Sequence, residues 1–134
     1  MVKINEIEGI GETYAKKLTN AGLGTVEVFL EKAAAPKGRQ GIADQTGIDA
    51  TLILKWANRA DLHRVKGIGS EYADLLEAAG VDTVVELSKR VPANLLAKME
   101  EANKAKELVR KLPTLKQVED WVDQGKKLPR LLTY

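Results

Sequence analysis

One stretch of twenty residues occurs twice in this sequence: IEGIGETYAKKLTNAGLGTV at 7–26 returns as VKGIGSEYADLLEAAGVDTV at 65–84. At an offset of 58 residues, ten positions of the first copy are identical in the second: Gly9, Ile10, Gly11, Tyr14, Ala15, Leu18, Ala21, Gly22, Thr25 and Val26. Identity of this extent at one fixed offset indicates an internal repeat, in which each copy is one supersecondary unit. We therefore expect two copies of one small fold to make up most of the chain.

Both copies have the pattern of helices joined by tight turns. Apolar residues after each Gly-Ile-Gly recur at helical spacing, and no segment alternates as a strand would. These helices are expected to end at Gly22 and Gly80, which suit a left-handed position after a helix. Thr25 and Thr83 are predicted N-caps of the next helices, and Thr83 with Glu86 has the spacing of a capping box.

The match extends further if the second copy is two residues shorter. Pro36 then aligns with Pro92, and both suit a first helical position. Gly47 aligns with Asn103, so each is predicted to supply the positive φ between a third and a fourth helix. Trp56 aligns with Leu112. The buried positions of the two fourth helices are predicted to be Leu52, Ile53, Trp56 and Ala60 in the first copy, and Ala105, Leu108, Val109 and Leu112 in the second.

The remaining residues predict a C-terminal helix and an extended tail. Thr114 and Gln117 have capping-box spacing, and Trp121 lies on an apolar stripe, so it is interpreted as a core residue like Trp56. The tail LPRLLTY contains apolar side chains that are unfavourable in water. We expect it to dock, either in a groove between the two repeats or on a neighbouring subunit.

Composition excludes several function classes. The 134 residues include no cysteine and one histidine, His63, so a disulfide framework, the usual zinc site and thiol or Ser-His chemistry are not expected. No apolar run is long enough to span a bilayer or to serve as a signal peptide core. We therefore expect a cytoplasmic, non-enzymatic protein with no cofactor, no metal and no membrane association.

Two segments resemble a known motif. IEGIGETYAKKL and VKGIGSEYADLL resemble the helix-hairpin-helix motif, and the longer string of each repeat is similar to the N-terminal helical domain of archaeal and eukaryotic strand-exchange recombinases. The whole chain is similar to a family of bacterial and archaeal proteins catalogued as a domain of unknown function, DUF family 4332. The resemblance implies an all-α fold of two tandem helix-hairpin-helix (SAM-like) units at 1–62 and 63–112, followed by a C-terminal helix and docking tail at 113–134.

The motif also suggests what the chain binds. Backbone N–H groups at a helix start, together with the positive end of the helix dipole, attract anions such as phosphate without reading bases. The leading hypothesis is sequence-independent binding of a DNA or RNA phosphate backbone. The candidate contacts are Gly67, Ile68 and Gly69 with Arg64 and Lys66 beside them, Gly9, Ile10 and Gly11, and the cations Lys55 and Arg59.

The distribution of charge keeps a second hypothesis open. The places after the second glycine hold Glu12 and Thr13, or Ser70 and Glu71, where nucleic-acid binders of this kind carry Lys or Arg. Residues 65–88 contain one basic and five acidic side chains, whereas residues 89–112 contain seven basic and three acidic ones. An adaptor that binds another protein, or a second copy of itself, through these acidic and basic segments is the alternative.

Overall fold

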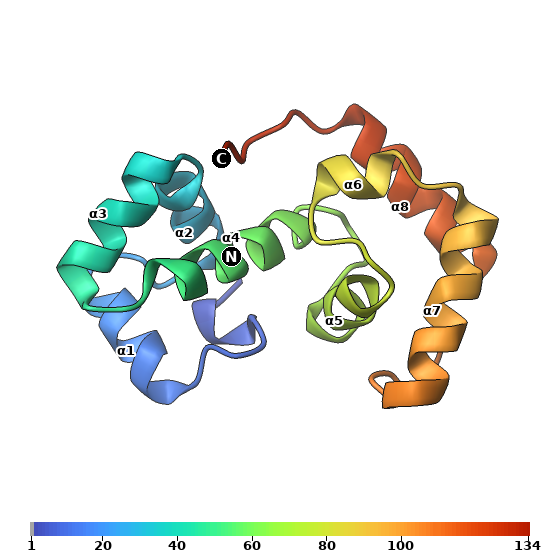
Figure 1. The fold of residues 1–134 in the computed structure, drawn as a ribbon, viewed down its shortest axis with the longest axis horizontal. Coiled ribbons are helices and arrows are strands. Elements are labelled where there is room, and N and C mark those ends of the chain that lie inside the picture. Colours follow the sequence, from blue (N-terminus) through green and yellow to red (C-terminus); the bar gives the residue numbers. More distant parts are fainter. Residues whose placement is uncertain (1) are drawn as a thin grey trace. The chain divides into compact units, whose positions relative to one another are not determined.

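The computed structural model describes residues 2–134, and every regular element among them is a helix (Figure 1). The elements are η1 (Ile4–Glu6), α1 (Glu12–Asn20), α2 (Val26–Ala33), α3 (Pro36–Thr46), α4 (Ala50–Leu62), α5 (Ser70–Ala78), α6 (Val84–Ser88), α7 (Pro92–Lys106) and α8 (Leu115–Lys127). Lys3 and Thr25 form an isolated antiparallel bridge. The predicted all-α fold is confirmed. No helix in the described part of the chain is both long and apolar enough to cross a membrane.

The chain forms two compact units. Unit 1 contains the residues up to Asp61 together with Leu131–Tyr134, and unit 2 contains Leu62–Arg130. The C-terminal helix α8 is therefore part of unit 2, whereas the last four residues are part of unit 1.

Most helix boundaries follow from local sequence signals. The Thr25 side chain accepts a hydrogen bond from the Val28 N–H at 3.3 Å and so caps α2, and Thr83 caps α6 in the same way. Thr114 forms the predicted capping box at the start of α8. Pro36 and Pro92 begin α3 and α7. These caps satisfy N–H groups that the first turn of a helix leaves without an intrahelical partner.

Two local predictions are wrong. Glu86 accepts from the Asp82 N–H at 3.3 Å, one residue before the Thr83 N–H that a capping box requires. Asn103 lies inside α7, and the left-handed residue that follows α7 is Glu107, with φ +50°. The Asn103 side chain instead makes two hydrogen bonds with the backbone of Val109, at 3.0 and 3.2 Å, which stabilise the turn after the helix.

The predicted fourth helix of the second copy is also wrong. No helix is found between the end of α7 at Lys106 and the start of α8 at Leu115. The structural counterpart of α4 is α8, and the counterpart of Trp56 is Trp121 instead of Leu112. Tyr14 contacts Trp56 with ring centroids 5.1 Å apart, and Tyr72 contacts Trp121 at the same distance.

Each unit has its own hydrophobic core. The core of unit 1 is built around Phe29, Leu18 and Trp56, which are at most 1% exposed. The core of unit 2 is built around Leu76 and Trp121, and α8 packs against both α6 and α7. The interpretation of both tryptophans as core residues is confirmed. Each Tyr–Trp pair adds about 0.5–1.5 kcal/mol beyond the area that it buries.

The C-terminal tail docks on unit 1 of its own chain. Leu132 is 3% exposed and belongs to the core of unit 1, and the Thr133 N–H donates to the Ala34 carbonyl at 2.8 Å. In Figure 1 the C-terminus lies beside the end of α2. The last four residues are therefore part of the first unit, although they follow the second unit in the sequence.

Candidate nucleic-acid interface

Two glycine loops precede helices of equal length. Glycine loop 1 consists of Gly9, Ile10 and Gly11 before α1, and glycine loop 2 consists of Gly67, Ile68 and Gly69 before α5. In each loop the isoleucine is buried, at 3% and 4% exposure, while the two glycines are exposed. The buried isoleucine fixes the loop to the core and leaves its glycine backbone at the surface.

The first glycine of each loop has a backbone conformation that other residues avoid. The φ angles are +92° at Gly9 and +97° at Gly67. A Cβ at Gly67 would lie 2.9 Å from the Trp121 Nε1 atom, so the loop backbone approaches the indole closely. Only glycine allows both the positive φ and this approach.

The second glycine of each loop is the N-cap of the following helix. Gly11 and Gly69 are extended, and no side chain caps α1 or α5 from these positions. Since the first N–H groups of a helix lack intrahelical partners and lie at the positive end of the dipole, both helix starts favour a negatively charged group.

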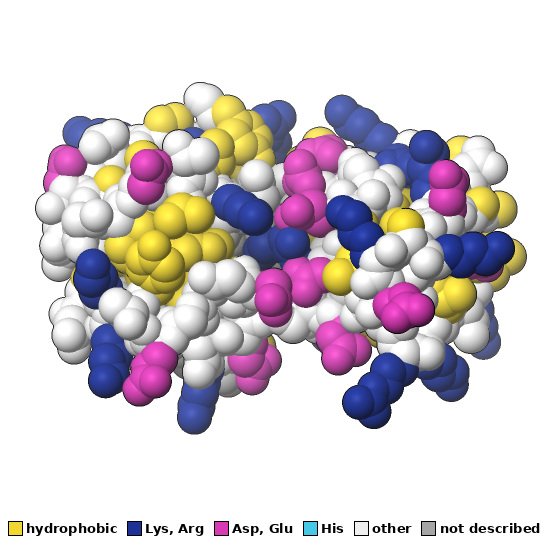
Figure 2. Space-filling view, turned by 60° about the horizontal axis from the view of Figure 1, so that its bottom comes forward, with side chains coloured by type: hydrophobic (Ala, Val, Ile, Leu, Met, Phe, Trp, Pro, Cys, Tyr) yellow, Lys and Arg dark blue, Asp and Glu magenta, His cyan; other side chains and the backbone are white. Residues whose placement is uncertain are grey.

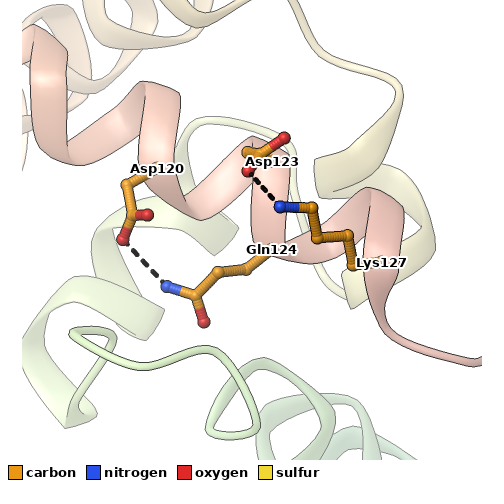
Figure 3. A network of polar contacts seen from close by, with 4 residues as sticks. All are labelled: Asp120, Asp123, Gln124 and Lys127. Atoms are coloured by element: carbon orange, nitrogen blue, oxygen red, sulfur yellow. Dashed lines mark hydrogen bonds and ion pairs between the residues drawn. The ribbon is translucent and has the colours of Figure 1, made fainter.

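Glycine loop 2 is held in place by α8. The Lys66 N–H donates to Gln124 Oε1 at 2.9 Å, and Gln124 Nε2 donates to the Lys66 carbonyl at 3.0 Å. Gln124 Nε2 also donates to Asp120 one turn earlier in α8, at 2.9 Å, as Figure 3 shows. In the same view Lys127 forms an ion pair with Asp123 at 3.0 Å. Gln124 therefore fixes the backbone of Lys66, whose side chain is exposed.

A basic loop also lies against the start of α5. The connection between α7 and α8, residues 107–114, carries the exposed cations Arg110 and Lys111. Tyr72, in the first turn of α5, donates its hydroxyl to the Lys111 carbonyl at 3.2 Å. The repeat offset grows from 58 residues at the glycines to 65 at the tryptophans, so unit 2 is longer here than unit 1. This extra length supplies cations that the sequence comparison did not assign to the site.

The charged residues predicted beside the loops lie in different surroundings. Arg64 is half-buried, and its Nη1 donates to the Pro129 carbonyl at 2.8 Å, so it holds the chain that leaves α8. Lys55 is exposed on α4, whereas Arg59 is only 7% exposed. Both lie in unit 1, whereas Arg64 and Lys66 lie in unit 2. The structure thus groups Lys66 with loop 2 and buries Arg59.

Glycine loop 1 has acidic neighbours. Glu8 and Glu12 are exposed, and Glu12 pairs with Lys16 at 3.6 Å, both side chains being at least 75% exposed. Such an exposed pair contributes little to stability. A surface groove of about 590 Å³ beside α1 is lined in part by Ile10, Glu12 and Lys16. The carboxylates make loop 1 less attractive to phosphate than loop 2.

No metal-binding cluster of three or more His, Cys, Asp or Glu side chains is found within residues 2–134.

Comparison with protein families gives one match over most of the chain: residues 8–128 match the model described as a domain of unknown function, DUF4332. No curated protein and no solved structure matches the sequence.

Proposed function

The chain belongs to the DUF4332 family, and from its site we propose that it is a non-enzymatic, sequence-independent nucleic-acid-binding protein built from tandem helix-hairpin-helix units. The observation that supports this proposal is the exposed glycine loop 2 at the start of α5: its N-cap Gly69 provides no side-chain cap, and the backbone of the preceding Lys66 is held by two hydrogen bonds with Gln124. A loop that is held in place before binding loses less conformational entropy when it binds a ligand.

In this proposal the backbone of loop 2 binds a phosphate, and nearby cations strengthen the contact. Lys66 precedes the loop, and Arg110 and Lys111 lie on the segment held by Tyr72. Contacts of this kind position a nucleic acid without reading its bases. Glycine loop 1 is the second and weaker site because of its carboxylates.

The charge pattern limits the number of phosphate contacts. In Figure 2 the Lys and Arg side chains (dark blue) are interspersed with Asp and Glu side chains (magenta). Exposed or half-buried acids on α5, namely Glu71, Asp74 and Glu77, repel a backbone that would run along this helix. We therefore expect about three phosphate contacts, through Lys66, Arg110 and Lys111.

Salt dependence tests this proposal. For three contacts on duplex DNA, counterion release predicts a slope of about −2.7 in log K against log salt, which is roughly a 40-fold loss between 50 and 200 mM. Fluorescence anisotropy with labelled duplex DNA, single-stranded DNA and RNA measures this slope. Lys66→Ala should reduce it by about 0.9, whereas Lys127→Ala, a control at an exposed ion-paired lysine of the same unit, should leave it unchanged. Absence of binding at micromolar protein in 50 mM salt, or equal effects of the two substitutions, would contradict the proposal.

A second candidate function is a protein adaptor. The observation that favours it is a groove of about 300 Å³ between α5 and α7, lined by alanines and by Lys98, Glu101 and Lys106. A groove with small side chains and charged edges suits a partner helix with complementary charge. The adaptor becomes the better explanation if the anisotropy experiment shows no binding to DNA or RNA.

A further inference from the structure

The C-terminal tail occupies a site that unit 1 builds for it. Leu132 fills the core of unit 1, and the Thr133 N–H donates to the Ala34 carbonyl at 2.8 Å. The Tyr134 hydroxyl donates to Asn58 Oδ1 at 2.8 Å. Backbone, aliphatic and aromatic groups of the tail thus all contact unit 1.

Arg39 is the central residue of this site. Its side chain is only 6% exposed, and Nη1 donates to the carbonyls of Ala33 and Ala34 at 2.8 and 3.1 Å. Nη2 donates to the Thr133 carbonyl at 2.7 Å, and the guanidinium carbon lies 5.6 Å from the centroid of the Tyr134 ring. Two of the three carbonyls that accept hydrogen bonds from Arg39 thus belong to unit 1 outside the tail.

A single residue, Arg130, joins the tail to residues that are held in unit 2. Leu128 packs in the core of unit 2, and the Pro129 carbonyl is held there by Arg64. Leu131 and Tyr134 are 41% and 61% exposed, so Leu132 is the one residue of 131–134 that belongs to a hydrophobic core. Release of the tail therefore breaks its contacts with unit 1, whereas Leu128 and Pro129 keep their contacts in unit 2.

We propose that the Arg39 site binds residues 131–134 of a second copy of this chain, so that two copies exchange their tails. A second copy supplies the same leucine, the same backbone groups and the same terminal tyrosine that the site already contacts, so the bonds are identical in both arrangements. The two arrangements, with the tail on its own chain or on a second copy, differ only in the direction that the chain takes around Arg130. Reciprocal exchange satisfies both sites and gives a closed, two-fold dimer, which is a low-cost route to association.

The protein's own tail competes with the tail of a second copy. A short tether gives an effective concentration of the order of millimolar, so unaltered chains should exchange tails only as the protein concentration approaches this value and should be monomeric at micromolar concentration. We take the docked tail to be favoured about 100-fold over the released one. A millimolar effective concentration divided by this factor gives a Kd of about 10 μM for a tail from another molecule, in a chain whose own tail no longer competes for the site.

Two complementary variants of the full chain test this inference. Arg39→Ala disables the site and keeps the tail, whereas Leu132→Ser disables the tail and keeps the site. Each variant alone should remain monomeric at 100 μM, and an equimolar mixture should form a one-to-one dimer, measured by sedimentation or light scattering. A mixture that stays monomeric while both variants keep their circular dichroism spectra would overturn the proposal.

A peptide titration keeps the test decisive if Arg39→Ala fails to fold. A labelled peptide of residues 128–134 is titrated into the Leu132→Ser chain, and the same peptide with serine at the Leu132 position is the control. The native peptide should bind with a Kd of about 10 μM and the control at least about tenfold more weakly, because burial of leucine provides most of the discrimination. Equal or absent binding of the two peptides would refute the proposed site. The nucleic-acid proposal is independent of this result, since glycine loop 2 lies in unit 2.

Discussion

The two first glycines of the loops form a matched pair for substitution. Gly9 and Gly67 have nearly the same φ, +92° and +97°, so alanine at either position adopts an unfavourable backbone conformation. This strain costs about 1–3 kcal/mol at each site. Their neighbours differ: a new Cβ would lie 3.5 Å from Trp56 Nε1 at Gly9, an ordinary contact, but 2.9 Å from Trp121 Nε1 at Gly67.

The closer contact in unit 2 should make Gly67→Ala the more damaging change. Trp121 is 2% exposed and packs against Tyr72, so it cannot move away without disturbing the core. Overpacking of this kind adds about 1–3 kcal/mol. We expect Gly9→Ala to lower the free energy of unfolding of unit 1 by about 1–3 kcal/mol, and Gly67→Ala to lower that of unit 2 by about 2–6 kcal/mol.

The chain's two tryptophans allow each unit to be followed separately. In a Trp121→Phe background the fluorescence of Trp56 reports on unit 1, and in a Trp56→Phe background that of Trp121 reports on unit 2. Urea unfolding in each background, with linear extrapolation to water, gives the two differences in unfolding free energy. If Gly9→Ala destabilises its unit as much as Gly67→Ala does, the contact with Trp121 has no energetic role and the reasoning fails.

Three further substitutions test local features of unit 2. Thr114→Ala removes the capping box of α8 and should lower the unfolding free energy by about 0.5–2 kcal/mol, measured by urea unfolding. Asn103→Ala removes both side-chain bonds to Val109 and should cost about 1–3 kcal/mol, with faster amide hydrogen exchange at Val109 as the specific readout. Tyr72→Phe keeps the ring contact but loses the hydroxyl bond, so it should cost only about 0.5–1.5 kcal/mol while weakening DNA binding if the basic loop contributes. Unchanged exchange at Val109, or unchanged DNA affinity in Tyr72→Phe, would contradict the roles given to these side chains.

Local sequence signals determined much of the fold. The caps at Thr25, Thr83 and Thr114 and the left-handed Gly22 and Gly80 depend on backbone contacts within a few residues, so their positions can be recognised in the sequence. The repeat of Gly-Ile-Gly likewise indicated two equivalent loops. Physical rules that act over one helical turn are sufficient for these features.

The partners of the loops depended on tertiary structure. Trp121 faces Gly67 from far along the chain, and the longer α7 and its connection to α8 hide this correspondence from an alignment of the two copies. Asn103 was assigned a positive φ because of its residue type, but in the folded chain its side chain bonds the backbone of Val109 and α7 continues past it. Long-range packing decided both outcomes.

The two buried arginines show most clearly which features can be recognised in the sequence and which depend on the tertiary structure. Charge made Arg59 a candidate for phosphate contact, although its spacing of three residues from Trp56 and seven from Leu52 places it on the predicted buried face of that helix, where the structure finds it. Arg39 attracted no attention in the sequence, yet it holds the tail through the Thr133 carbonyl. The sequence by itself determined where helices begin and end, because those signals are local. Only the tertiary structure decided which charged and aromatic side chains meet, because that depends on groups brought together by folding.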